Sequence, residues 1–344
     1  MITDNELKTI DNSVVFDSFI KARSVLAKHK KIAVSISGGA DSDIVLDLIE
    51  KAKTDENEVH YVWFDTGIEY QATKDHLIYL ENRYGITIER VRAKKTIPVS
   101  CKEFGQPFVS KYVSENIERM QKNGFKFEEK PQELLDKEYP TLRSAIAWWC
   151  DTRCRTKRDG MTSMFNIERN KWLKEFLVSN PPTFRISNKC CTYAKKKVSR
   201  DFNKASECDL NVIGVRRAEG GVRSALNNCY TDKNSHGVAT YRPIFWYGEE
   251  DKRWYEKHFS IVHSECYTKY GLKRTGCVGC PFNSKFLQEQ QQVETYEPGL
   301  IKACNVIFKD SYEYTKKYRE FQARMNAKEK ALKGQTDIYD FIKE

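Results

Sequence analysis

Four cysteines stand in two tight groups, with Cys190 adjacent to Cys191 and with Cys277 separated from Cys280 by two residues. Thiolates are soft ligands, and four of them suit an iron–sulfur cluster or a zinc ion; spacing alone leaves both metals open. Adjacent residues direct their side chains apart, so the vicinal pair fits the corners of a cubane more readily than one small tetrahedral zinc site. We therefore predict that these four residues hold one metal centre.

A second motif with chemical potential is the run Ser37-Gly38-Gly39-Ala40-Asp41-Ser42. Glycines lack a Cβ atom, so the backbone can turn tightly and bring its N–H groups against phosphate oxygens. Ser37 and Ser42 add hydroxyl donors. The run is neither a dinucleotide GxGxxG motif nor a Walker motif, because no lysine follows the glycines. We interpret Ser37, Gly38, Gly39, Asp41 and Ser42 as a phosphate loop.

Further polar residues could complete a nucleotide site. Asp65, Thr66 and Gly67 follow an apolar run, and the carboxyl end of a strand is where parallel sheets bind ligands. A turn without a ligand is the alternative interpretation. Arginine suits phosphates because its planar fork holds two anion oxygens, although any single basic residue could equally be a solvated surface residue. The predicted cationic lining consists of Lys195, Arg216, Arg217, Arg223 and Arg242.

Alternating strands and helices must position these residues. Apolar runs at 31–37, 59–64 and 86–91 predict buried strands, and residues 44–52 and 71–84 show helical spacing. This alternation predicts an α/β fold with a doubly wound parallel sheet. We expect one domain over 1–282, with a helical insertion at about 101–180, and a helical C-terminal segment over 283–344.

The composition narrows the class of protein. Among 344 residues, 58 Lys+Arg against 48 Asp+Glu give a net charge of +10, which suits polyanionic partners such as nucleotides or nucleic acid. No apolar run approaches the roughly 18 residues needed to span a bilayer, and the first residues do not resemble a signal peptide. We expect a cytoplasmic protein without a membrane partner. In that reducing compartment its 11 cysteines point to metal or redox chemistry rather than disulfides.

The phosphate loop resembles the SGGxDS loop of the PP-loop superfamily, which has an adenine nucleotide alpha-hydrolase-like fold. Within that superfamily, segment 64–73 and the four-cysteine pattern are similar to the phosphoadenosine-phosphosulfate (PAPS) and adenylyl-sulfate (APS) reductases that contain a 4Fe-4S cluster. Segments 214–223, 241–246 and 271–276 extend the resemblance, which covers about 31–282. It implies an adenine nucleotide (APS, PAPS or ATP), a 4Fe-4S cluster at the four cysteines, and Mg²⁺ where the nucleotide is ATP.

The resemblance fails at the C-terminal end. Reductases of this family carry a nucleophilic cysteine in an ECGLH-like tail, whereas residues 339–344 contain no cysteine. Cys304 is the only cysteine beyond Cys280, and its surroundings indicate an amphipathic helix and a packing role. Cys304 and Asp41 are the candidate catalytic residues.

Three functions remain open on the sequence. The first is a sulfonucleotide reductase that releases sulfite with a thioredoxin-like reductant. The second is an ATP pyrophosphatase that activates a nucleic acid or a small molecule, to which a sulfur donor then transfers sulfur. The third is a non-catalytic module that binds a nucleotide or nucleic acid.

Overall fold

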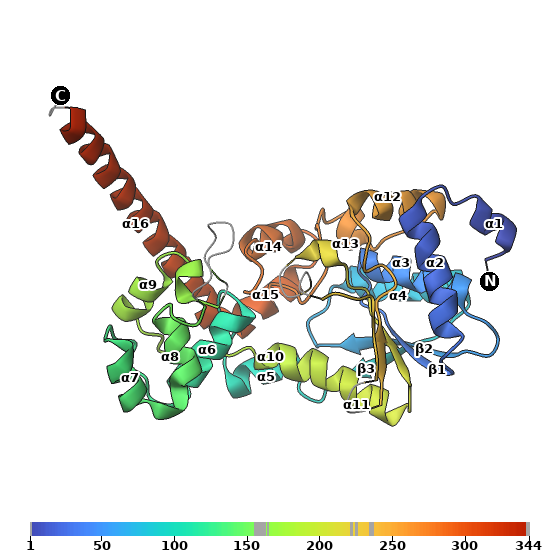
Figure 1. Ribbon diagram of the computed structural model, residues 1–344, viewed down its shortest axis with the longest axis horizontal. Coiled ribbons are helices and arrows are strands. Elements are labelled where there is room, and N and C mark those ends of the chain that lie inside the picture. Colours follow the sequence, from blue (N-terminus) through green and yellow to red (C-terminus); the bar gives the residue numbers. More distant parts are fainter. Residues whose placement is uncertain are drawn as a thin grey trace. The chain divides into compact units, whose positions relative to one another are not determined.

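The structure, a computed structural model, describes residues 2–154, 163, 165–220, 223, 226–233 and 237–341. The chain divides into two compact units (Figure 1). The sheet unit comprises Met1–Ile97, Cys191–Val278 and Leu287–Ile301. The helical unit comprises Pro98–Cys190, Gly279–Phe286 and Lys302–Glu344.

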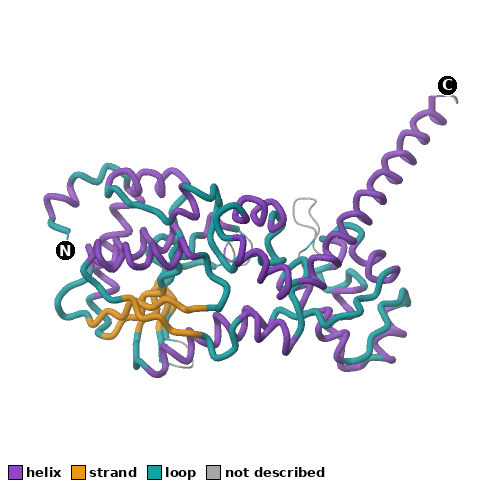
Figure 2. Tube along the Cα trace, turned by 180° about the vertical axis from the view of Figure 1, so that it is seen from behind, coloured by secondary structure: helices purple, strands orange, loops and turns teal. Residues whose placement is uncertain are grey.

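The sheet unit is built on one six-stranded sheet with the order β3-β2-β1-β4-β6-β5. Figure 2 shows the strands in orange, side by side within this unit. Its strands are β1 (Lys31–Ser35), β2 (Glu58–Asp65), β3 (Ile88–Arg92), β4 (Leu210–Val212), β5 (Tyr230–Thr231) and β6 (Ala239–Tyr241). All neighbours pair in parallel except β5, which runs antiparallel to β6. The predicted parallel α/β sheet is confirmed.

The chain reverses its direction of travel across the sheet at β1. From β1 it proceeds through β2 to β3 on one side, and later through β4 to β6 on the other side. Such a switch point leaves a crevice outside the carboxyl ends of the central strands, where α/β sheets bind ligands. The predicted phosphate loop directly follows β1, so the topology places it at this crevice.

Helices cover both faces of the sheet (Figure 1). The helical segments of this unit are α1 (Asp4–Lys8), α2 (Ser13–Leu26), α3 (Ala40–Ala52), α4 (Gln71–Tyr84), η3 (Thr192–Lys197), α11 (Val198–Ala205), η4 (Arg217–Glu219), α12 (Glu249–His258) and α13 (Glu265–Thr268). Two further helices, α14 (Phe286–Glu294) and α15 (Pro298–Ile307), include residues of both units.

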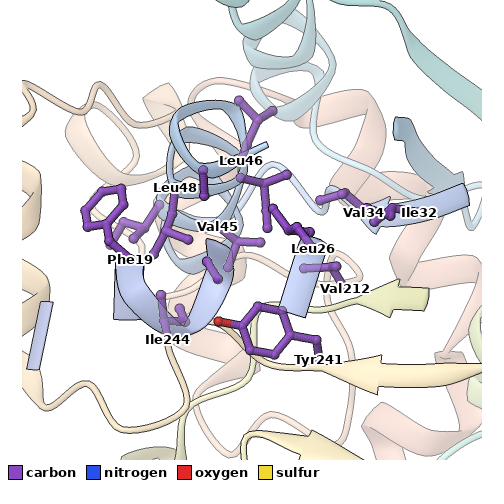
Figure 3. Packing of buried hydrophobic residues seen from close by; sticks show 14 of the residues in the cluster. Phe19, Leu26, Ile32, Val34, Val45, Leu46, Leu48, Val212, Tyr241 and Ile244 are labelled. Atoms are coloured by element: carbon purple, nitrogen blue, oxygen red, sulfur yellow. The ribbon is translucent and has the colours of Figure 1, made fainter. Parts of the chain in front are cut away.

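The core of the sheet unit fixes α3 against the strands. Val45 and Leu48 of α3 are fully buried and lie with Val34 of β1 and Tyr241 of β6 in one cluster (Figure 3). Burying an aliphatic side chain stabilises the fold by about 1.5–3 kcal/mol. Because the phosphate loop, residues 37–42, runs into the first turn of α3, this packing holds the loop in a fixed place on the sheet.

The helical unit contains most of α5 (Ile97–Phe104) and α10 (Lys189–Cys191), of which Ile97 and Cys191 belong to the sheet unit. Its other helical segments are α6 (Lys111–Lys122), α7 (Gln132–Glu138), η1 (Pro140–Leu142), α8 (Arg143–Trp149), η2 (Ile167–Arg169), α9 (Leu173–Ser179) and α16 (Lys309–Phe341). Its core is aromatic: the ring centroids of Phe108 and Tyr314 lie 4.8 Å apart, and those of Phe176 and Tyr318 lie 5.1 Å apart. The predicted insertion and the C-terminal segment therefore share one core. The predicted domain boundary at residue 282 stays a prediction.

Helix α16 is amphipathic only along its first part. Tyr314, Tyr318 and Phe321 recur at helical spacing and are buried in the helical unit, whereas Leu332 is 64% exposed. The helix extends well beyond the other helices of this unit (Figures 1 and 2). Among the described residues, every helix is either too short or too polar to span a bilayer.

Candidate nucleotide and cysteine site

The phosphate loop is held by contacts that only glycine permits. Gly38 has φ +67°, a left-handed conformation, and a Cβ atom there would lie 2.6 Å from Cγ2 of Thr73. A Cβ atom on Gly39 would lie 2.8 Å from Oγ1 of Thr275. The hydroxyl of Ser42 donates to the carbonyl of Gly39 (2.7 Å) and accepts from its N–H (3.1 Å). The loop is therefore a closed turn whose backbone is fixed where it enters α3.

Hydroxyl groups currently occupy loop donors that a phosphate could use. The N–H of Ala40, the first residue of α3, donates to the hydroxyl of Tyr267 (3.0 Å). That hydroxyl lies 3.3 Å from Oγ1 of Thr275. N–H groups at a helix N-terminus bind anions because they lack partners within the helix. Tyr267 and Ser42 thus fill positions that an anion could take.

A cavity of about 310 Å³ opens beside the loop, at the carboxyl ends of β1 and β2. Its volume lies at the lower end of the range for small-molecule sites. Its walls combine two aromatic residues and an isoleucine with hydroxyl groups, one carboxylate and two lysines. The lining residues are Ser35, Ile36, Ser37, Trp63, Phe64, Thr66, Glu69, Thr73, Lys195, Lys196, Ser199, Thr275 and Gly276.

Of the predicted strand-end residues, Thr66 lines this cavity, while Asp65 and Gly67 shape the turn. The carboxylate of Asp65 accepts from the N–H of Gly67 (2.8 Å), and Gly67 has φ +90°. The hydroxyl of Thr66 donates to Glu69 (2.5 Å). The direct nucleotide contacts assigned to Asp65 and Gly67 stay predictions.

Glu69 is a buried cavity residue that sequence reasoning missed. Burial raises the pKa of its carboxyl group, whereas the nearby Lys195 ammonium and the Thr66 hydroxyl act in the opposite direction. Its position four residues after Asp65, in the turn that leads into α4, was the available signal. Glu69 thus places a carboxylate near the Lys195 ammonium in the cavity wall.

Two of the predicted basic residues gather near Asp41. Nε of Arg216 lies 3.1 Å from Oδ2 of Asp41, and Nη1 of Arg216 lies 2.8 Å from Oε1 of Glu249. Arg223 pairs with Glu219 and is within electrostatic reach of Asp41. These contacts place cationic groups at the start of α3.

The other predicted basic residues have different surroundings. Lys195 lines the cavity. The Arg217 guanidinium lies over the ring of Trp246, 5.5 Å from its centroid. Arg242 donates to the hydroxyl of Thr231 (3.0 Å). Contacts of Arg217 and Arg242 with a nucleotide therefore stay predictions.

Lys252, on α12, was also missed. Its Nζ lies 3.0 Å from Oδ1 of Asp41, on the side opposite to Arg216. No motif marks it in the sequence, where it follows three acidic residues. Only the folded chain brings it to the phosphate loop.

A histidine–carboxylate network lies behind the loop. Nδ1 of His263 is 2.8 Å from Asp43, and Nε2 of the same ring is 2.9 Å from Glu256. Asp43 also lies 3.1 Å from Nε2 of His76. Burial lowers the pKa of His263, but hydrogen bonds to the two carboxylates outweigh it and raise the pKa to about 9. The network ties α3, α4 and α12 together.

Two of the four predicted cysteine ligands belong to the sheet unit. The thiol of Cys277 accepts a hydrogen bond from Lys195, lies 4.0 Å from Oγ1 of Thr66 and is within electrostatic reach of Cys191. Burial raises the pKa of this thiol, and the Lys195 ammonium lowers it. A cation beside two thiols suits thiolate ligands of a metal centre.

Cys190 and Cys280 belong to the helical unit, where Cys190 is buried. Within the part of the chain that the structure describes, no three His, Cys, Asp or Glu side chains form a group that could hold a metal ion. Convergence of the four thiols on one cluster therefore stays a prediction.

Cys304 is fully buried on α15, in the helical unit. A Cβ atom on Gly279 would lie 3.3 Å from Sγ of Cys304, so this thiol packs against the turn between Cys277 and Cys280. Gly279 has φ +60°, and its carbonyl accepts from the hydroxyl of Tyr312. Cys304 is therefore part of a packed helix.

Comparison with known proteins gives one family match. Residues 31–139 match the model of the phosphoadenosine phosphosulfate reductase domain. No protein with a curated description matches the chain.

Three solved structures illustrate the structural likenesses. Phosphoadenylyl-sulfate reductase from Candida auris has 12% identity and a TM-score of 0.41, over 80% of this chain and 96% of its own. The U34-tRNA thiolase NcsA from Methanococcus maripaludis, with its [4Fe-4S] cluster, has 14% identity and a TM-score of 0.39, over 90% of this chain and 79% of its own. FMN adenylyltransferase from Candida glabrata has 11% identity and a TM-score of 0.40, over 79% of this chain and 68% of its own. Likenesses at this level establish no shared function.

Proposed function

We propose that this chain, in which residues 31–139 match the model of the phosphoadenosine phosphosulfate reductase domain, is an enzyme of sulfur chemistry that binds an adenine nucleotide at its phosphate loop. The observation that carries the proposal is the cavity of about 310 Å³ beside Ser37, with Lys195 and Thr275 in its wall. The nucleoside occupies this cavity. Its phosphates extend over Gly38 and Gly39 to the N-terminus of α3.

Between the two enzymatic reactions, the position of Cys304 favours activation by ATP. Reduction of a sulfonucleotide requires a thiolate that attacks sulfur, and Cys304 is fully buried in a helix instead of lying in an exposed tail. In the ATP-dependent reaction an acceptor oxygen attacks the α-phosphate and pyrophosphate leaves. The donor's sulfur then displaces AMP from the adenylate. No protein thiol is needed for the first step.

In this reaction the chain's own side chains and backbone groups bind ATP and orient its phosphates. The phosphate loop fixes the α-phosphate, and Arg216 stabilises the negative charge that develops on the pyrophosphate leaving group. Mg²⁺ would accompany ATP and be held beside Asp41, whose carboxylate oxygens are hard ligands of the kind that Mg²⁺ prefers. The acceptor is a nucleic acid or a small molecule.

Sulfonucleotide reduction is the second candidate, and the family match over 31–139 favours it. It would release sulfite and require a thioredoxin-like reductant. An anaerobic turnover panel with ATP, APS and PAPS separates the two reactions. Pyrophosphate from ATP without sulfite supports the first. With a dithiol reductant present, sulfite and AMP from APS, or sulfite and adenosine 3′,5′-bisphosphate from PAPS, support the second.

We also propose a 4Fe-4S cluster on Cys190, Cys191, Cys277 and Cys280. The fit rests on the donor set: Cys277 and Cys191 are close enough to interact, and Lys195 compensates negative charge beside them. When bound, a cluster would adjust the electrostatics of the neighbouring cavity. Cys277 directly follows Gly276, which lines that cavity. A residue of the proposed metal centre is therefore adjacent in sequence to a residue of the proposed nucleotide site.

A further inference from the structure

Asp41, in the first turn of α3, is held between two cations from distant parts of the chain. Nε of Arg216 lies 3.1 Å from one carboxylate oxygen and Nζ of Lys252 lies 3.0 Å from the other. The side chains of Arg216 and Lys252 are only 8% and 16% exposed. Removing charged groups from water is costly, so these cations need anionic partners, and Asp41 is the one that lies between them. Each cation has one further acid, Glu249 at 2.8 Å from Arg216 and Glu256 at 3.8 Å from Lys252.

The position of that anion coincides with the place where a phosphate is expected. The carboxylate lies at the N-terminus of a 13-residue helix and directly follows the loop of Gly38 and Gly39. A Cβ atom added to Gly214, just after β4, would lie 3.3 Å from the Asp41 carbonyl oxygen, so the chain that leaves β4 packs closely against the first turn of α3. Ser35 and Ser37, at the start of the loop, line the cavity. Asp41 thus supplies an internal anion at the other end of the loop.

Further positive charge surrounds the same carboxylate. Burial lowers the pKa of Arg223, and the charges of Arg274 and Arg216 lower it further, whereas Asp41 acts in the opposite direction. Like charges this close repel one another unless anions lie among them. The acids that pair with these cations from outside the loop include Glu249, whose side chain is 68% exposed and therefore screened by water.

We propose that Lys252 and Arg216 form the binding site for the terminal two phosphates of a nucleoside triphosphate, and that Asp41 occupies this site until the nucleotide arrives. The inference rests on the proposed function, which it deepens by naming the residues that hold the terminal phosphates and the internal group that they displace. On binding, the phosphate oxygens replace the Asp41 carboxylate between the two cations. The released carboxylate is then available to the Mg²⁺ that accompanies the nucleotide. No covalent bond changes in this exchange.

Calorimetric titration of the full chain with ATP, inorganic pyrophosphate and AMP tests the proposal. Lys252→Gln should weaken the binding of ATP and pyrophosphate at least about tenfold, because a charge-assisted hydrogen bond is lost, and leave AMP affinity unchanged. Lys252→Arg should restore most of the affinity. Lys257→Gln is the matched control, since Lys257 is an exposed lysine of the same helix.

Asp41→Asn should change pyrophosphate affinity in the opposite direction to Lys252→Gln. It removes the internal competitor, so the affinity for Mg²⁺-free pyrophosphate should rise, which a purely structural role of Asp41 would not produce. Equal weakening of AMP and ATP in Lys252→Gln, or unchanged pyrophosphate affinity in both variants, would overturn the proposal. Failure of the proposed function is distinguishable, because it appears as absent pyrophosphate release in the turnover panel while Lys252→Gln still lowers pyrophosphate affinity.

Discussion

Nδ1 of His263 lies 2.8 Å from the carboxylate of Asp43, the residue two positions after Asp41 in the first turn of α3. The other nitrogen of the ring meets Glu256 of α12. A protonated imidazole therefore bridges two carboxylates and joins the helix that follows the phosphate loop to the helix that carries Lys252. This bridge makes the stability of the sheet unit depend on pH.

The first prediction concerns that dependence. The pKa of His263 is raised from 6.5 to about 9, so its contribution is complete below about pH 6.5 and is lost as the pH rises through 9. The free energy of unfolding should fall over this window by at most about 3 kcal/mol. His263→Gln should flatten the dependence in denaturant titrations at several pH values. His258→Gln is the control, because His258 is exposed on α12; an unchanged slope in His263→Gln would contradict the assignment.

The second prediction concerns Gly39. Gly39→Val should weaken adenine-nucleotide binding by at least about tenfold, because the new side chain would meet Thr275 and the hydroxyl of Tyr267 in the space that the phosphate needs. The fold should be largely retained, since φ at this position is −101°. Calorimetry gives the affinity and circular dichroism the melting temperature. In Gly299→Val, where nothing lies within 4 Å, nucleotide affinity should not change.

The third prediction concerns the metal. Anaerobically purified protein should be brown and contain about four irons per chain with acid-labile sulfide. Cys277→Ser should lose most of this iron. Cys229→Ser should keep it, since Cys229 is another partly buried cysteine of the sheet unit that lies outside the four-cysteine pattern. Stoichiometric zinc without sulfide would rule out the cluster.

The fourth prediction concerns Cys304. If ATP activation is the reaction, Cys304→Ala should leave pyrophosphate release unchanged while lowering stability by about 1–2 kcal/mol, as expected for truncating a fully buried side chain. Mass spectrometry after incubation of the unaltered chain with APS or PAPS supplies the opposing test. An adduct of sulfite mass on Cys304 would establish it as a nucleophile and favour the reductase.

The sequence predicted those features that depend on local pattern. The apolar run at 31–37 predicted the strand that the structure shows as β1 over Lys31–Ser35, and the two glycines after it predicted the loop. Strand burial and tight turns leave a signature within a few residues. Lys252 left no such signature. It reaches Asp41 only because α12 packs beside α2, against the same face of the sheet as α3. His263 and Asp43 likewise meet across 220 residues of sequence.

The aromatic residues of α16 also show that local pattern does not predict contacts between distant segments. Tyr314, Tyr318 and Phe321 have the spacing of an amphipathic helix, which was recognisable, but the spacing does not say what they pack against. Their partners Phe108 and Phe176 lie in a segment that the sequence marked only as a helical insertion. Periodicity identifies a buried face and leaves its partner open.

The shared core of α16 and the insertion has a consequence for how the chain folds as it is synthesised. The N–H of Ser311 donates to the side chain of Gln106, and these residues are 205 positions apart. A ribosome adds residues far more slowly than helices form, so the segment 98–190 waits for many seconds with its aromatic surface uncovered. Until residues 311–321 have emerged, that surface is open to chaperones and to other nascent chains.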